Sequence, residues 1–212
     1  MATRTTAGAA EKRRAILDAA IRVFAERGFN HCRVSDIADE AGVAYGLVYH
    51  YFKSKDAVLD EVFLERWGLM LEVIEQATAD EALTAREKLA KVATFIVESY
   101  GHRPDVMQVV IVEVTRQANT FGRRHWTTIQ RGHAGIAQIV ADAQERGELR
   151  SDIPPSFAGI VFYGAIEQLL TSWIFGVLPA EPEDRRRAVE TLVETICGGL
   201  DPREGQAAVP GP

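Results

Sequence analysis

The chain has 212 residues, 47% of them hydrophobic, and a formal net charge of −6 at pH 7. This apolar fraction can close a core, and the acidic charge argues against a protein that coats nucleic acid through bulk charge. Cys32 and Cys197 lack CxxC spacing and neighbouring histidine pairs, so we expect no metal site, no disulfide and a cytoplasmic location. The most apolar run, residues 157–178, is interrupted by Glu167 and Gln168, so we expect no membrane span.

The first 54 residues predict a flexible segment followed by three helices. Residues 1–10 are polar and are expected to be flexible. The first helix is expected over residues 11–27, where apolar residues recur at helical spacing before a stop at Gly28; they are Ile16, Ala19, Ala20, Val23 and Phe24. Two short helices are expected over residues 35–41 and 45–52. Residues 11–54 therefore form the first predicted domain.

Residues 55–199 predict a second domain of six helices. Each one has a start or stop signal of its own, such as a capping box, a first-turn proline or a closing glycine. The first three helices are expected from Lys55 to about Ala79, from the Thr84–Glu87 capping box to about Tyr100, and from Pro104 to about Asn119. The last three are expected over residues 123–146, where Gly147 ends the helix, from Pro154–Pro155 to about Phe175, and from Pro182 to Gly198–Gly199. We read no convincing strand pattern, so the fold class is all-α. Residues 200–212 are expected to be a disordered tail.

The second and third helices, joined at Gly42, have the spacing of a helix-turn-helix, a unit that places one helix in the DNA major groove. An ordinary corner between two helices has the same spacing. The third helix, however, carries phenol and imidazole groups that can donate to phosphate oxygens, and ammonium groups follow it. The helix residues are Tyr45, Tyr49, His50 and Tyr51, and the lysines after it are Lys53 and Lys55. The side chains of one helix cannot all face DNA, and some must pack in the core. We assign Val48 and Phe52 to packing and expect Tyr51 to be partly buried.

Residues 28–38, 41–43 and 47–55 resemble the N-terminal signature of the TetR family of repressors, in order and in spacing. The resemblance implies contacts with DNA base edges from Ser35, Tyr45, Gly46 and Leu47. It also implies contacts with phosphates from Tyr49, His50 and Lys55. Arg33 and Ala44 depart from the family pattern, which usually has small hydroxyl residues there. We assign Arg33 to a phosphate contact, and Ala44 leaves the third helix without a side-chain cap.

The resemblance further implies a homodimer on a palindromic operator, built mainly from the last two helices. We place its interface at Phe162, Ile166, Leu170, Val189, Leu192 and Val193. The run from Ile160 to Ile174 supports this independently, because it is apolar on more than one face and could serve a core and a partner at once. The alternative is a helix buried in the core of a monomer.

Scattered positions in the second domain resemble the acyl-CoA-responsive FadR subgroup of the family: Glu113, residues 115–117, Arg123–Arg124 and residues 164–173. An acyl chain needs a long apolar cavity, and coenzyme A phosphates need cations near its mouth. We expect the ligand pocket to be lined by Val92, Phe95, Ile96, Val109, Val110, Glu113, Phe162 and Trp173. We expect the ligand phosphates to meet Arg116, Arg123 and Arg124. The ligand would release the repressor from DNA.

Other classes of function have weaker support in the sequence. Trp67, Trp126, Trp173 and Glu167 would also suit a multidrug sensor that controls an efflux pump through aromatic and acidic contacts to cationic drugs. A helical interaction protein without DNA binding is a remote third alternative. No set of nucleophile, base and orienting residue is apparent, and no HExxH or GxSxG motif is present, so we expect no enzyme activity and no cofactor.

Overall fold

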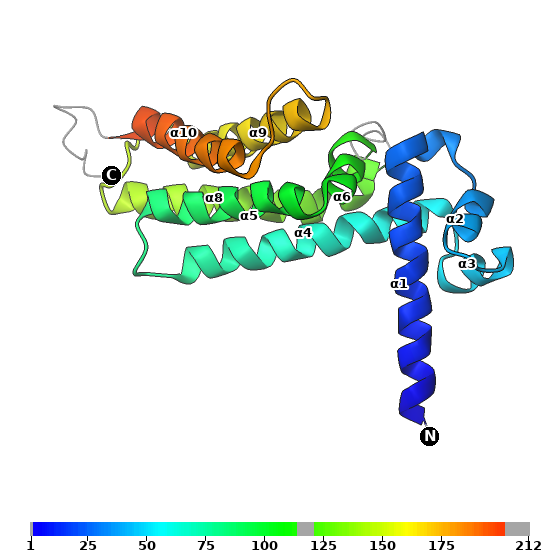
Figure 1. The fold of residues 1–212 in the computed structure, drawn as a ribbon. Helices are drawn as coiled ribbons and strands as arrows, with labels where there is room; N and C mark the ends of the chain where they lie inside the picture. Colours follow the sequence, from blue (N-terminus) through cyan, green and yellow to red (C-terminus); the bar gives the residue numbers. More distant parts are fainter. Residues whose placement is uncertain (1, 114–120, 202–212) are drawn as a thin grey trace. The chain divides into compact units, whose positions relative to one another are not determined.

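The structure is a computed structural model that describes the backbone of residues 2–113 and 121–201 and the side chains of residues 8–112 and 124–201. Every regular element in this part of the chain is helical, which confirms the all-α fold (Figure 1). The chain forms two compact units, Met1–Arg66 with Arg103–Arg123 and Trp67–His102 with Arg124–Pro212. The division falls within helices α4 (Lys55–Ala79) and α8 (Phe121–Glu145), not before Lys55, because the first three turns of α4 belong to the first unit.

The first unit contains the three predicted N-terminal helices. They are α1 (Ala2–Arg27), α2 (Val34–Glu40) and α3 (Tyr45–Tyr51), with a short 3₁₀ segment η1 (Phe29–His31) after α1. All five apolar residues that predicted α1 are buried, at most 3% exposed. They pack in a core to which α2, α3 and α4 contribute Ile37, Ala38, Val48, Val58, Leu59 and Val62.

Helix α1 begins at Ala2, whereas the sequence led us to expect a flexible segment over residues 1–10. Its N-terminal part (blue in Figure 1) extends past α2 and α3. Residues 2–10 contain four alanines and no proline, so nothing in them stops a helix. The apolar periodicity shows only the packed portion of the helix, which begins at Ile16, and so it could not locate the start.

The helix expected from Pro104 to about Asn119 is shorter in its α-helical part. Pro104 begins α6 (Pro104–Gln108) in a first-turn position, as predicted, but the winding then widens into a π-helical segment, η2 (Val109–Glu113). The segment reads VVIVE, and its β-branched residues crowd the preceding turn of an α-helix, which favours a local departure from regular winding. The end expected near Asn119 lies outside the described residues.

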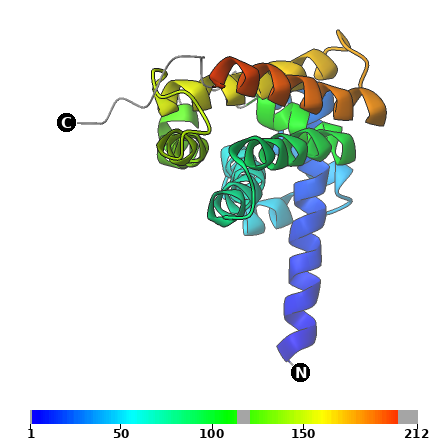
Figure 2. The same ribbon diagram turned by 90° about the vertical axis from the view of Figure 1, so that its left-hand side faces the viewer.

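The second unit contains the rest of α4 and α8 together with α5 (Ala85–His102), α9 (Pro155–Ile174) and α10 (Pro182–Leu200). Figures 1 and 2 both show α9 and α10 side by side. The predicted capping box is present, since Thr84 N donates to Glu87 Oε2 at 2.9 Å and Glu87 N donates to Thr84 Oγ1 at 3.3 Å. Helix α10 continues through Gly198 and Gly199 to Leu200, because the burial of Leu200 holds the last turn in the core. Of the tail expected over residues 200–212, positions 202–212 lie outside the described residues.

By length and composition alone, α9 could cross a membrane. One face of it instead lies in the core of the second unit, through Ala158, Gly159, Phe162, Ile166, Leu170 and Trp173. The other face carries Phe157, Ile160 and Val161, which are 60%, 55% and 41% exposed. The helix is therefore apolar both on the side that packs and on a side that does not.

Glycines on α8 let α4 approach closely. A Cβ at Gly135 would lie 2.5 Å from Ile74 Cγ2, and one at Gly132 would lie 3.3 Å from Trp67 Cζ2. Larger side chains at these positions would have to displace α4. Gly68 on α4 is different, because no atom lies within 4 Å of the place where its Cβ would be.

Candidate DNA-binding and ligand-binding sites

The turn between α2 and α3 is fixed by backbone hydrogen bonds. Gly42, at φ +63°, donates to Asp39 O at 3.1 Å, and Val43 N donates to Ala38 O at 3.0 Å. This is the Schellman pattern, in which a residue with positive φ closes the helix and satisfies its last carbonyls. The glycine predicted at this corner thus sets the angle at which α3 leaves α2, and the helix-turn-helix is confirmed.

Helix α3 separates packing side chains from side chains that can meet DNA. Val48 and Phe52 are 1% and 3% exposed, and Tyr51 is half-buried, as predicted. Tyr45 and Tyr49 are 53% and 44% exposed, which is unusual for aromatic residues in a unit with a closed core. Their rings meet edge to face at 5.2 Å, and the Tyr45 hydroxyl donates to Tyr49 Oη at 3.2 Å.

The other positions predicted to contact DNA are accessible to different degrees. Arg33, Gly46 and His50 are exposed, and Ser35 and Leu47 are half-buried. Ala44 leaves the start of α3 without a side-chain cap, as the departure from the family pattern predicted. At α2, Asp36 accepts a hydrogen bond from Arg33 N at 2.6 Å, which satisfies a backbone donor before the helix begins. Contacts between these residues and DNA remain predictions.

Lys55 is engaged with the protein itself. Its Nζ donates to Phe29 O at 2.5 Å and to Cys32 O at 2.9 Å, and it lies 4.4 Å from the centroid of the Phe29 ring. The ammonium group therefore ties the first residue of α4 to the segment between α1 and α2. Two of the three ammonium hydrogens are thereby used within the protein, and the predicted phosphate contact of Lys55 remains a prediction.

Two arginines of α1 form ion pairs with α4, and the sequence analysis had not singled them out. Arg14 Nη1 donates to Glu65 Oε1 at 2.7 Å, Arg13 pairs with Glu61, and the Arg13 guanidinium lies 4.9 Å from the centroid of the Phe52 ring. Arg14 and Asp18 at i and i+4 on a predicted helix were a visible signal of pairing, but their long-range partners were not. The helix-turn-helix is thus fixed to the start of α4 by charge as well as by its core.

Comparison with known proteins identifies both parts of the chain. Residues 16–62 match the family model described as bacterial regulatory proteins, tetR family, and residues 63–179 match the C-terminal region of the YsiA-like proteins. The fatty acid metabolism regulator protein of Bacillus subtilis is 33% identical over 188 residues, covering 87% of this chain and 93% of that protein. This chain belongs to the TetR family.

Further relatives agree with this assignment. The transcriptional repressor KstR2 of Mycolicibacterium smegmatis is 35% identical, covering 97% of this chain and 98% of that protein. The crystal structure of the transcriptional regulator FadR from Bacillus subtilis in complex with stearoyl-CoA has a TM-score of 0.77 and 27% identity, covering 88% of this chain and 98% of that one. The chain is a TetR-type transcriptional repressor with an N-terminal DNA-binding domain and a C-terminal ligand-binding domain.

The residues predicted to line a ligand pocket in this TetR-family chain fall in both units. Val92, Phe95, Ile96, Phe162 and Trp173 lie in the second unit, and Val109 and Val110 lie in the first. Phe95 is half-buried and the other six are buried. The side chains of Glu113, Arg116 and Arg123 lie outside the described part of the structure, and Arg124, the first residue of α8 whose side chain is described, is exposed. The pocket and its phosphate contacts remain predictions.

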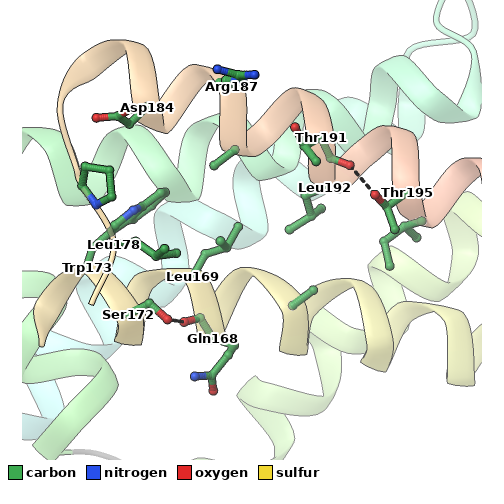
Figure 3. Close-up of a pocket in the computed structure, with 14 residues that line it drawn as sticks. Gln168, Leu169, Ser172, Trp173, Leu178, Asp184, Arg187, Thr191, Leu192 and Thr195 are labelled. Carbon is green, nitrogen blue, oxygen red and sulfur yellow. Dashed lines mark hydrogen bonds between the residues drawn. The ribbon is translucent and has the colours of Figure 1, made fainter. Parts of the chain in front are cut away.

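A groove of about 590 Å³ lies between α9 and α10 (Figure 3). Its lining includes Leu169, Trp173, Leu178 and Leu192. Of the residues predicted for the ligand pocket, only Trp173 is part of it. The hydroxyls of Ser172 and Thr195 in this groove donate to carbonyls of their own helices, Gln168 O at 2.8 Å and Thr191 O at 2.7 Å. They therefore contribute little free hydrogen-bonding capacity, and the groove presents a largely apolar surface.

The side chains named for the dimer interface are buried within the chain's own core. Phe162, Ile166 and Leu170 are at most 1% exposed, and Val189, Leu192 and Val193 are 5–8% exposed. A residue already covered by its own chain offers little surface to a partner, and the predicted interface remains a prediction. The two faces of α9 are both apolar in the sequence, and periodicity alone could not say which one packs inward.

Proposed function

We propose that this repressor binds a palindromic operator as a homodimer and is released by a long-chain acyl-CoA. The observation that carries the proposal is the 33% identity to the fatty acid metabolism regulator of Bacillus subtilis over nearly the whole chain. The structural likeness to FadR in complex with stearoyl-CoA supports the same class of ligand. The transcriptional regulators TtgR of Pseudomonas putida and AcrR of Shigella flexneri are less similar to this chain, at 27% and 28% identity, and the multidrug alternative has no better support.

The exposed apolar face of α9 supports the dimer. Phe157, Ile160 and Val161 leave a continuous part of this helix uncovered next to the α9–α10 groove. An apolar surface of this kind is stable in water when it meets a second apolar surface. In a two-fold dimer the same patch serves both partners, and this symmetry demands a symmetric operator.

An acyl chain can supply the free energy that a switch needs. Moving a population from 1:99 to 99:1 takes a difference in affinity of about 10⁴-fold, or ~5.5 kcal/mol, between the two conformations. Each buried methylene contributes about 0.8 kcal/mol, so roughly seven methylenes held better in the released conformation would suffice. A long chain is therefore required, and a short one would bind without releasing the operator.

The decisive experiment is operator release measured across ligands. An operator is first selected from random duplex DNA with the purified protein, and release is then titrated with stearoyl-CoA, butyryl-CoA, stearate and an aromatic cation. A ketosteroid is included because the similar KstR2 of Mycobacterium tuberculosis is described as a ketosteroid transcriptional regulator. We expect release by stearoyl-CoA at concentrations where butyryl-CoA has no effect. Release by the aromatic cation or the ketosteroid, with no response to stearoyl-CoA at tens of micromolar, would refute the proposal.

A further inference from the structure

A polar cluster lies inside the second unit, between α8 and α9. The rings of His133 on α8 and Tyr163 on α9 have their centroids 5.2 Å apart, and Tyr163 also contacts the ring of Trp67 at 5.8 Å. Glu167 lies one turn after Tyr163 on α9. The indole N–H of Trp67 is already used, since it donates to Thr128 O at 2.9 Å. Three titratable side chains thus gather beside an aromatic surface in the sensor unit.

His133 Nε2 is buried and has no hydrogen-bond partner in the described part of the chain. A buried polar atom without a partner is unfavourable, and in native proteins such atoms call for a specific explanation. Burial lowers the pKa of His133 and raises the pKa values of Tyr163 and Glu167. All three shifts are towards the uncharged forms, because burial disfavours charge.

The burial of this cluster and its unpartnered imidazole determine which polar group of a ligand could bind there. A carboxylate entering here would lose its hydration shell without meeting a cation in the cluster. A carbonyl oxygen carries no net charge and accepts a hydrogen bond from a neutral imidazole N–H. In an acyl-CoA, the thioester carbonyl is the polar group adjoining the apolar chain, and it enters an apolar interior together with that chain.

We infer that His133 is a specificity-determining residue of the sensor, whose Nε2–H donates to the carbonyl oxygen of a bound thioester. This inference rests on the proposed acyl-CoA response. The unpartnered imidazole makes the ligand-free protein less stable than it would otherwise be, and the thioester restores the missing hydrogen bond. His133 therefore favours ligand binding at the expense of stability in the free protein.

The test compares stearoyl-CoA with S-octadecyl-CoA, a thioether with the same chain length and no carbonyl oxygen. Isothermal titration of the full-length wild-type protein should show the thioester binding about tenfold more tightly, the effect of one hydrogen bond at a desolvated site. His133→Leu should bring this ratio close to one. His133→Gln, whose amide N–H has a similar reach, should keep most of it. Gln138→Leu, on the exposed face of α8, is the matched control and should leave the ratio unchanged.

The thermal stability of the ligand-free variants gives a second readout. Replacing the unpartnered imidazole with leucine should raise the Tm by about 2–4 °C, whereas a histidine with a purely structural hydrogen bond would lower it. Equal wild-type affinity for the two compounds, or a tenfold preference that survives in His133→Leu, would overturn the inference and leave the proposed function standing. If neither compound bound the wild-type protein, the proposed function itself would fail and the inference with it.

Discussion

Replacing Lys55 with methionine separates two roles that the sequence and the structure assign to this residue. The family resemblance implies a phosphate contact, whereas the structure places the ammonium on Phe29 O and Cys32 O. Methionine keeps much of the apolar stem and removes the charge and both hydrogen bonds. Lys53→Met, an exposed lysine two positions earlier, is the matched control for thermal stability.

The structure gives the size of the expected loss in stability. A hydrogen bond from a charged donor contributes about 1.5–3 kcal/mol, and a cation over an aromatic ring adds about 0.5–1 kcal/mol near a surface. Two such hydrogen bonds and one ring contact, discounted because the site is only partly buried, suggest a loss of about 2–4 kcal/mol. For a chain of this size, the Tm should fall by roughly 5–15 °C, whereas Lys53→Met should change it little.

Operator binding measured at several salt concentrations distinguishes the two roles. Each phosphate contact contributes about 0.9 to the slope of log K against log salt concentration. If Lys55 stays on its two carbonyls in the complex, Lys55→Met should weaken binding to all sequences through a loosened DNA-binding unit and leave the slope unchanged. A slope that became shallower by about 0.9, with an unchanged Tm, would refute this reasoning. It would instead support the predicted contact between Lys55 and a DNA phosphate.

Three further substitutions test other parts of the structure. Tyr45→Ala should change which bases a selected operator contains with little effect on the salt slope, as read from repeated selection, because an exposed ring on α3 is expected at a base edge. Gly68→Ala should raise the free energy of unfolding in urea by about 0.5–1 kcal/mol, because alanine favours the helix and the added methyl meets no atom; a loss of stability would contradict this. Ile160→Glu should convert the dimer to a monomer in light scattering while the circular dichroism spectrum is retained, and a dimer that persisted would move the interface off this face of α9.

The elements of this fold could be predicted because their signals are local. Pro104, Gly147 and the Thr84–Glu87 capping box each act within one helical turn, and all three occur in the structure as expected. The start of α1 and the end of α10 were misplaced for a related reason. Residues 2–10 carry no stop signal, and Gly198–Gly199 carry one that the burial of Leu200 overrides.

The site was harder to predict because side-chain roles depend on distant partners. Val48 and Phe52 could be assigned to packing because they lie four residues apart, on one face of the turn that α3 begins. Lys55 contacts carbonyls that lie 26 and 23 residues away in the sequence, and its position at the start of a helix gives no sign of them. For α9, an apolar helix with two apolar faces does not reveal which face packs inward, and so the interface residues were placed on the buried one.

The division of the chain into two units runs through the middle of helices. Two of the three places where the chain passes from one unit to the other lie inside helices, between Arg66 and Trp67 in α4 and between Arg123 and Arg124 in α8. A continuous helix hardly stretches, but it bends. At both crossings the backbone therefore passes from one unit to the other as unbroken helix, without a loop. Gly68, two residues past the crossing in α4, has the weakest intrinsic preference for a helix in that turn, so α4 itself should bend most easily there.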